Sequence, residues 1–198
     1  MEFKKIQLNG FKSFAEKTTF IIDKGLTGIV GPNGCGKSNI VESLRWCMGE
    51  TSAKSMRGSG MEDVIFSGTS NKPSKNIAEV SIAISNENKD GPIQYKNLDN
   101  IEIRRKIEKD KGSKFYINDK EVRAKDAQMF FADLSTGAHS PSIISQGRIG
   151  ALVTAKPTDR RAVLEEAAGI AGLHVRRHEA ELRLGAAKNI LKRADELR

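Results

Sequence analysis

The sequence has little that would stabilise a small extracellular fold or hold a chain in a membrane. Only two cysteines, Cys35 and Cys47, occur in 198 residues, so there is no framework for a disulfide-rich fold. No apolar run approaches the length of a membrane-spanning helix. The opening MEFKKIQLNG also lacks the apolar core of a signal peptide. These absences favour a cytoplasmic chain with reduced thiols and no membrane partner.

Charge is plentiful and unbalanced. Lysine and arginine total 33 against 25 acidic residues, which gives a net charge of +8 and a pI near 9.5. This balance favours a polyanionic partner, either a nucleotide or a nucleic acid. Much of the excess falls in helical stretches, where charge is also typical of a solvated face.

The first 120 residues predict an α/β domain rich in strands. A helix is expected from about Lys37 to Met48, because its apolar positions repeat at helical spacing. Residues 86–100 are polar and predict a loop, and the tract 68–76 is rich in turn formers and predicts an exposed connection. Strands are expected at residues 2–9, 17–22, 26–30, 78–85, 101–107 and 114–117.

The C-terminal part changes character. No proline occurs from Thr158 to Arg198, and residues spaced alternately by four and three form a heptad seam. The seam consists of Leu173, Arg177, Ala180, Leu184, Ala187, Leu191, Ala194 and Arg198. We therefore expect a head lobe over residues 1–170 and the truncated start of an antiparallel coiled coil over 171–198.

The strongest motif runs from Gly31 to Ser38 and reads GPNGCGKS. It fits G-x-x-x-x-G-K-[S/T], with an apolar run before it and an amphipathic helix after it. Glycines let the backbone approach a phosphate closely, and the N-terminal dipole of the following helix attracts the anion. Lys37 would supply a full charge to the β- and γ-phosphates, and the Ser38 hydroxyl could ligate Mg²⁺. The alternative is a glycine-rich turn that merely starts a helix.

Three segments together resemble the N-terminal head of the SMC (structural maintenance of chromosomes) ATPases, and the bacterial versions more than cohesin and condensin. These segments are KKIQLNGFKSF at residues 4–14, residues 31–50, and SIISQGRIGALVTAKPTDRRAVLEEAAGI at residues 142–170. The resemblance implies an ABC-type P-loop ATPase lobe, with a mixed sheet and an antiparallel β-subdomain. It also implies ATP and Mg²⁺ as cofactors, and a cytoplasmic, nucleoid-associated location.

The resemblance also assigns roles to individual residues. Gln146 corresponds to the glutamine that touches Mg²⁺ and the attacking water, although a glutamine here could equally be a solvated loop residue. Arg57 matches an arginine presented near the nucleotide and DNA, although beside Lys54 it could be part of a plain basic patch. The expected nucleotide contacts are Lys12, Ser13, Gly31, Pro32, Asn33, Gly34, Cys35, Gly36, Lys37, Ser38, Asn39 and Arg57.

Two parts of an ABC-type ATPase do not occur in these residues: an apolar strand ending in aspartate and glutamate, and an L-S-G-G signature loop. The stretch 134–137 (LSTG) is not taken as the signature, because Pro141 would fit poorly in a helix continuing from it. Glu165 and Glu166 lie on a predicted helix as surface charge. His174 and His178 have zinc-ligand spacing, but they lack a third ligand and lie beside arginines.

The resulting hypothesis is the ATP-binding half of an SMC head. ATP would bring heads together, and hydrolysis would require the C-terminal half of the same chain. Expected partners are that C-terminal half, a second SMC subunit in a homodimer, a kleisin-type subunit and DNA bound without sequence preference. Two alternatives remain: a related ABC-type DNA-repair ATPase, and a non-catalytic scaffold lobe for a kleisin-type partner.

Overall fold

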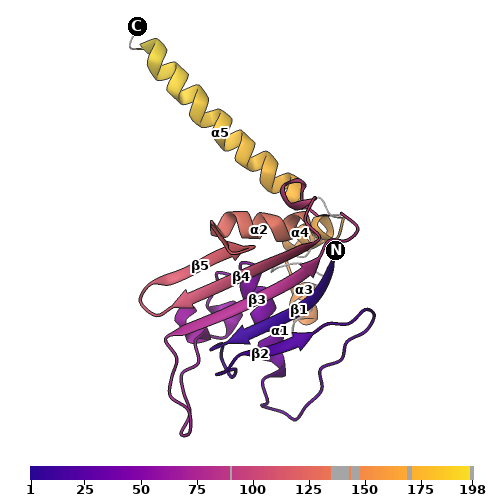
Figure 1. Cartoon of the computed structure of the whole chain (residues 1–198). Helices are drawn as coiled ribbons and strands as arrows, with labels where there is room; N and C mark the ends of the chain where they lie inside the picture. Colours follow the sequence, from indigo (N-terminus) through magenta and orange to yellow (C-terminus); the bar gives the residue numbers. More distant parts are fainter. Residues whose placement is uncertain (90, 135–142, 144–147, 169–170, 197–198) are drawn as a thin grey trace.

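A computed structural model describes residues 1–89, 91–134, 143, 148–168 and 171–196, and it shows a two-layer α/β lobe with one protruding helix (Figure 1). Six strands form one sheet in the order β2-β1-β3-β4-β5-β6, and every neighbouring pair is antiparallel. The strands are β1 (Glu2–Asn9), β2 (Thr18–Ile21), β3 (Ile77–Ser85), β4 (Asn100–Glu108), β5 (Gly112–Ile117) and β6 (Lys120–Val122).

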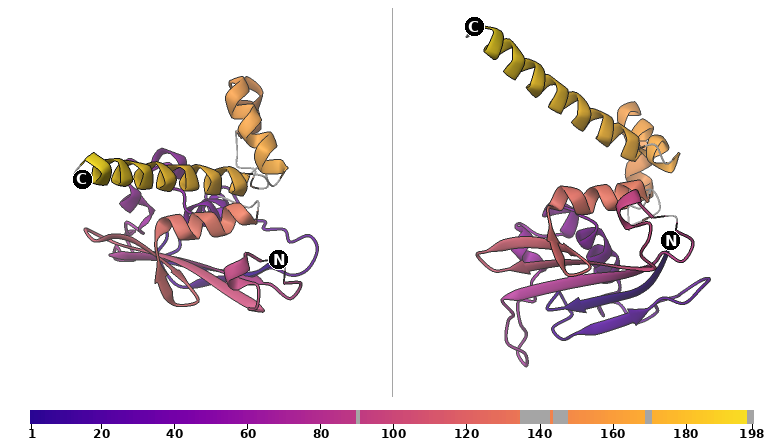
Figure 2. Two further views of the ribbon diagram at one scale, coloured as in Figure 1. Left: turned by 90° about the horizontal axis from the view of Figure 1, so that it is seen from above. Right: turned by 45° about the horizontal axis from the view of Figure 1, so that its top comes forward.

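Helices cover one face of this sheet. Figure 2 shows α1 (Lys37–Cys47) and α2 (Ala124–Asp133) on the same side, with the other face open. Short 3-10 turns occur at η1 (Lys54–Met56), η2 (Met61–Val64) and η3 (Ile93–Tyr95). The remaining helices are α3 (Arg148–Thr154), α4 (Pro157–Ala167) and α5 (Ala171–Glu196).

The core follows from the two-residue period of the strands. Along β4, the side chains of Ile101, Ile103, Arg105 and Ile107 are buried under the helices, while their neighbours face outward. The register places Ile103 opposite Ile82 of β3, and the cluster continues through Ile6 of β1. Burial of these aliphatic side chains from several strands at once fixes the register, because a one-residue slip would expose them all.

The predicted strand over residues 26–30 is wrong. This segment is not a strand, and Leu26 and Val30 are 101% and 93% exposed. The reason is that burial of a short apolar strand depends on its neighbours, and no strand of the described sheet pairs with it. The other predicted strands are confirmed within one or two residues, and so are the helix near Lys37 and the turn-rich tract.

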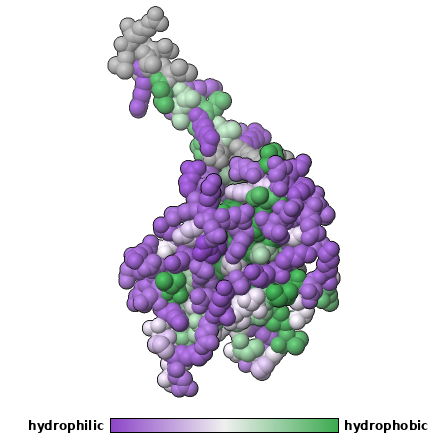
Figure 3. All heavy atoms as spheres, in the orientation of Figure 1, coloured by the Kyte–Doolittle hydropathy of each residue, from purple (hydrophilic) through white to green (hydrophobic). Residues whose placement is uncertain are grey.

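Figure 3 shows apolar side chains gathered at the lower right of the molecule, on the side of the loop after β2.

The long C-terminal helix is confirmed, since α5 runs unbroken through 26 residues and projects away from the sheet (Figures 1 and 2). Its first part lies beside α2. Of the predicted seam, Leu184 is exposed, as expected for a heptad position without a partner helix in the described residues. The side chains of Leu173, Leu191, Ala194 and Arg198 lie outside the described ones. The division at residue 170 remains a prediction.

Candidate functional site

The glycine-rich segment forms a tight turn that leads directly into α1. Gly34 and Gly36 both have positive φ, at 84° and 95°, a conformation that side chains other than glycine rarely adopt. A Cβ atom on Gly36 would lie 2.5 Å from the hydroxyl oxygen of Ser13. Glycine is therefore needed at position 36 both for the backbone angle and for close approach of the loop after β1.

The N-terminus of α1 carries no side-chain cap within the described residues, and its first turn contains no acidic residue. The helix begins instead with Lys37, and the positive end of the helix dipole disfavours the positive charge of this side chain. The Lys37 Nζ atom donates hydrogen bonds to the carbonyl oxygens of Gly31 and Pro32, at 2.5 and 2.6 Å. A cation and an uncapped helix N-terminus in one loop together provide what a phosphate group needs. The residues therefore fit a nucleotide phosphate.

Three residues from separate parts of the sequence meet beside this loop. The Asn39 side-chain amide donates to the Ser13 hydroxyl at 2.9 Å, and its carbonyl oxygen accepts from the Arg57 guanidinium at 3.0 Å. The structure thus brings Ser13 and Arg57 to the first turn of α1, and their predicted contacts with a nucleotide stay a prediction.

Lys12 joins the same cluster through Glu42 of α1. The Glu42 carboxylate pairs with the Lys12 ammonium through one oxygen and with the Arg57 guanidinium through the other. The Glu42 side chain is only 10% exposed, whereas that of Arg57 is 58% exposed. Both basic residues also have positive φ, at 46° and 54°. One carboxylate therefore holds two strained loops against the phosphate-loop helix.

Sequence reasoning missed Glu42. The available signal was that it is the single acidic residue within α1, at a position buried among apolar neighbours. Nothing in the sequence gave the identity of its two partners, because they lie in loops before and after the helix.

The far end of α1 is anchored to the sheet by Arg105 of β4. Its guanidinium donates to the backbone carbonyl oxygens of Trp46 and Glu50, each at 2.7 Å. It lies between the rings of Trp46 and Phe115, with its central carbon 4.5 and 4.6 Å from the two ring centres. Burial lowers the pKa of Arg105 to about 10, so the group still carries its charge at neutral pH.

Cys47 and Cys35 lie in opposite environments. Cys47 is buried between α1 and the sheet, and burial raises the pKa of its thiol to about 12. Cys35 is exposed in the phosphate loop, with its sulfur 3.9 Å from the Lys37 Nζ atom. Of the two thiols, only that of Cys35 is accessible to a reagent that would probe the glycine loop.

The remaining predicted residues are placed as follows. Ser38 is exposed at the start of α1, so its hydroxyl is accessible to a nucleotide-bound cation. Gln146 and residues 135–137 of the rejected signature lie outside the described residues, as do the side chains of His174 and His178. Within the described part of the chain, no three His, Cys, Asp or Glu residues gather as a metal site. Glu165 pairs with Arg161 on α4 at 2.7 Å, and the side chain of Glu166 lies outside the described ones.

Taken together, the sheet, the covering helices and the glycine loop define a class: an α/β lobe of the ABC type with a glycine-rich loop before its first helix. Residues 2–147 match the sequence profile described as RecF/RecN/SMC N terminal domain. The chain therefore belongs to this family.

Its relatives are bacterial chromosome-partition proteins. The chain is 54% identical over 197 residues to the chromosome partition protein Smc of Rhodopseudomonas palustris, covering 100% of this chain and 17% of that protein. Identity to the Smc of Myxococcus xanthus is 45% over 198 residues, covering 98% of this chain and 16% of that protein. The chain thus spans about a sixth of the length of these relatives.

Solved structures of SMC heads share the fold. An SMC head bound to the C-winged helix domain of ScpA superposes with a TM-score of 0.79 and 34% identity, covering 86% of this chain and 52% of that one. An SMC head with an extended coiled coil from Pyrococcus furiosus, bound to the C-terminal domain of ScpA, has a TM-score of 0.78 and 33% identity, covering 98% and 48%. Across the described residues, no helix is long and apolar enough to cross a membrane.

Proposed function

We propose that this chain is the ATP-binding N-terminal lobe of the head of an SMC chromosome-partition ATPase. The observation that carries the proposal is the position of Lys37, whose ammonium group lies inside the glycine loop at an uncapped helix N-terminus. The β- and γ-phosphates would replace the two carbonyl oxygens that Lys37 now contacts. Charge-assisted contacts to phosphate are stronger than those to neutral carbonyl groups, so the exchange favours binding.

The other residues of the site would hold the nucleotide from the side. Ser13 and Asn39 fix the loop after β1 against the first turn of α1, and Arg57 adds a positive charge there. Ser38 would ligate Mg²⁺, and Gln146 would approach the metal and the attacking water. Mg²⁺ would neutralise charge on the phosphate oxygens when bound.

The whole protein would couple this site to chromosome structure in the cytoplasm. Solved relatives are described by ATP-driven dimerization, DNA-stimulated activation and binding to ScpA. We infer the same classes of partner here: the C-terminal half of the chain, a second SMC subunit, a kleisin-type subunit and DNA. The exposed apolar residues Leu26 and Val30 support the first of these, since a strand from the missing half would bury them.

The two alternatives are less well supported. A DNA-repair ATPase would share the fold, since the family profile also covers RecF and RecN. The relatives named above are chromosome-partition proteins, which favours the SMC assignment. A pure scaffold lobe would not need a lysine at a helix N-terminus or two strained basic loops beside it.

The test is calorimetric titration of MgATP into the chain and into Lys37→Ala. Loss of one charge-assisted contact worth about 2–3 kcal/mol should weaken binding by about 30–150-fold. Ser38→Ala should weaken binding with Mg²⁺ more than binding without it. Lys188→Ala, on the exposed face of α5, is the matched control and should bind as the unmodified chain does. Equal affinity of Lys37→Ala and the control would refute the proposal.

A further inference from the structure

One carboxylate stands between the two basic loops beside the glycine loop. One oxygen of Glu42 accepts from the Lys12 ammonium, and the other accepts from the Nε atom of Arg57. The Glu42 side chain is only 10% exposed, so it is held by the packing around α1. Glu42 lies on the second turn of that helix, directly after the residues that would surround a phosphate group. Both cations are therefore tied to a fixed point close to the glycine loop.

The two cations differ in the hydrogen-bond donors that they have left. The Lys12 ammonium also donates to the backbone carbonyl oxygen of Met56, and its side chain is 14% exposed. Lys12 therefore braces the loop after β1 against η1. The Arg57 guanidinium is more open: Nε contacts Glu42, Nη2 contacts the Asn39 side chain, and Nη1 has no partner among the described residues. Because the Arg57 side chain is 58% exposed, its Nη1 edge is accessible to a ligand.

We propose that Glu42 is a positioning residue, which orients Arg57 so that the free edge of its guanidinium faces the phosphate chain of a nucleotide. This inference rests on the function proposed above and adds a residue to that site. Asn39 lies in the first turn of α1, so the Nη2 contact places the guanidinium beside the backbone amides that an anion would bind. A guanidinium suits this role because its five donors can be shared, some with the lobe and the others with phosphate oxygens.

This role predicts an effect opposite in sign to that of charge alone. Glu42 carries a negative charge beside a site for a triphosphate, and like charges repel. If Glu42 acted only through its charge, its neutralisation would tighten nucleotide binding. If Glu42 positions Arg57, its neutralisation should weaken binding, because the released guanidinium must then be ordered by the nucleotide at a cost in conformational entropy. The direction of the change therefore separates the two roles.

The test is calorimetric titration of MgATP into the 198-residue chain and its variants. Glu42→Gln and Arg57→Ala should each weaken binding by about tenfold, the effect of one hydrogen-bonded contact. The double variant should bind within about twofold of either single variant, because both changes remove the same contact. Glu42→Asp restores the carboxylate and should bind more tightly than Glu42→Gln. Equal or tighter binding by Glu42→Gln, or additive losses in the double variant, would overturn the proposal.

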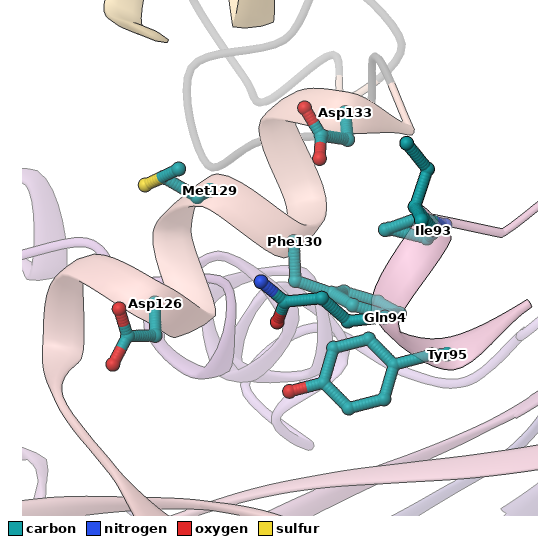
Figure 4. Close-up of a pocket in the computed structure, with 8 residues that line it drawn as sticks. Ile93, Gln94, Tyr95, Asp126, Met129, Phe130 and Asp133 are labelled. Atoms are coloured by element: carbon teal, nitrogen blue, oxygen red, sulfur yellow. The ribbon is translucent and has the colours of Figure 1, made fainter. Parts of the chain in front are cut away.

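Asp126→Asn is the matched control. Asp126 pairs with Arg123 at 3.3 Å and caps the first turn of α2, so this variant also removes one negative charge and an ion pair. Figure 4 shows Asp126 at the edge of a cavity of about 290 Å³ between α2 and η3. The described residues that line this cavity include none of the Glu42 cluster, so MgATP affinity should change by less than about twofold. A loss as large as that of Glu42→Gln would assign the effect to destabilisation and overturn the proposal.

A further variant tests the proposal even if Glu42→Gln fails to fold. Arg57→Lys keeps the positive charge but has a single side-chain nitrogen, which the Glu42 carboxylate would occupy. It should bind MgATP as weakly as Arg57→Ala does. Unmodified affinity in Arg57→Lys would show that a charge near the glycine loop is sufficient, and would overturn the proposal.

Lys37→Ala separates this inference from the proposed function. Unchanged MgATP affinity in Lys37→Ala would refute both, because the nucleotide site itself would be absent. Weakened binding by Lys37→Ala together with equal or tighter binding by Glu42→Gln would overturn only the positioning role of Glu42.

Discussion

Replacement of Arg105 should destabilise the lobe more than replacement of any exposed arginine. Its residue exposure is 3%, and its guanidinium joins the β4–β5 hairpin to the end of α1, which is distant in sequence. The two carbonyl groups it satisfies belong to Trp46 and Glu50, at and just beyond the C-terminal end of α1, where backbone acceptors lack helical partners.

The size of the effect follows from opposing contributions. Two hydrogen bonds from a charged donor are worth about 4 kcal/mol together. Stacking between Trp46 and Phe115 adds about 2 kcal/mol for a desolvated cation. Burial of the charge opposes them, since it lowers the pKa of Arg105 to about 10, which corresponds to a cost of about 3 kcal/mol. Arg105→Ala should therefore lower the free energy of unfolding by about 3 kcal/mol.

The pH dependence has a defined sign. Because burial lowers the folded-state pKa to about 10, the unfolded chain binds more protons at this group only near and above about pH 10, where stability would rise with pH. Below that window both states are charged, so the loss in Arg105→Ala should be constant from about pH 6 to 9.

Urea unfolding followed by Trp46 fluorescence measures this loss. Arg105→Lys is the informative companion, because it keeps a buried charge but loses both the forked hydrogen bonds and the stacking. It should be at least as unstable as Arg105→Ala. Arg183→Ala, on exposed α5, is the control and should change stability little. Wild-type stability of Arg105→Lys would show that charge alone, and not the geometry, explains the burial of this residue.

Three further outcomes are expected. Ellman's reagent should modify one thiol quickly in the folded chain, Cys35, while Cys47 reacts only after unfolding; two fast thiols would contradict the buried, high-pKa environment. Glu42→Gln should lower the free energy of unfolding by about 1–2 kcal/mol, because it weakens two ion pairs at a nearly buried carboxylate. Glu16→Gln, whose partner is also exposed, should cost less than about 0.5 kcal/mol in the same urea experiment. Finally, the chain alone should release phosphate from MgATP no faster than Lys37→Ala does, since it lacks the aspartate–glutamate strand and the signature loop; turnover that disappears in Lys37→Ala would reveal a missed catalytic base.

Local patterns predicted most of the sheet because apolar and polar residues alternate along the individual strands, which indicates the buried face. The two-residue period of β3 and β4 places the aliphatic side chains on one face whatever the partner strand is. The same reasoning failed for residues 26–30, where composition indicated burial but the neighbours that would bury the segment are not among the described strands. It also missed α2, although Ala127, Phe130 and Phe131 lie at helical spacing.

The residues of the candidate site also divide into those that the sequence predicted and those that it missed. Lys37 and the glycines follow from a contiguous motif whose chemistry is local, and Ser13 and Arg57 came from resemblance to a family. Glu42 and Arg105 were found by neither route. Each acts through at least one partner that is distant in sequence, Arg57 for Glu42 and Trp46 for Arg105, and such contacts exist only after folding. Buried charges of this kind need the tertiary structure to identify them.

The segments before and after the phosphate loop differ in how firmly the rest of the lobe holds them. After the loop, α1 is held by Glu42 at its first turns and by Arg105 at its end. Before the loop, Leu26 and Val30 pack against little, so the backbone entering Gly31 is constrained mainly by the chain itself. Nucleotide binding of the proposed kind would fix that entry segment at a cost in conformational entropy. A neighbouring strand that buried Leu26 and Val30 would remove this cost in advance, and it would raise ATP affinity without contacting the nucleotide. By linkage, ATP would strengthen the pairing of that strand by the same factor. Under the function proposed above, the exposed apolar segment would thus couple assembly of the complete head to occupancy of the nucleotide site.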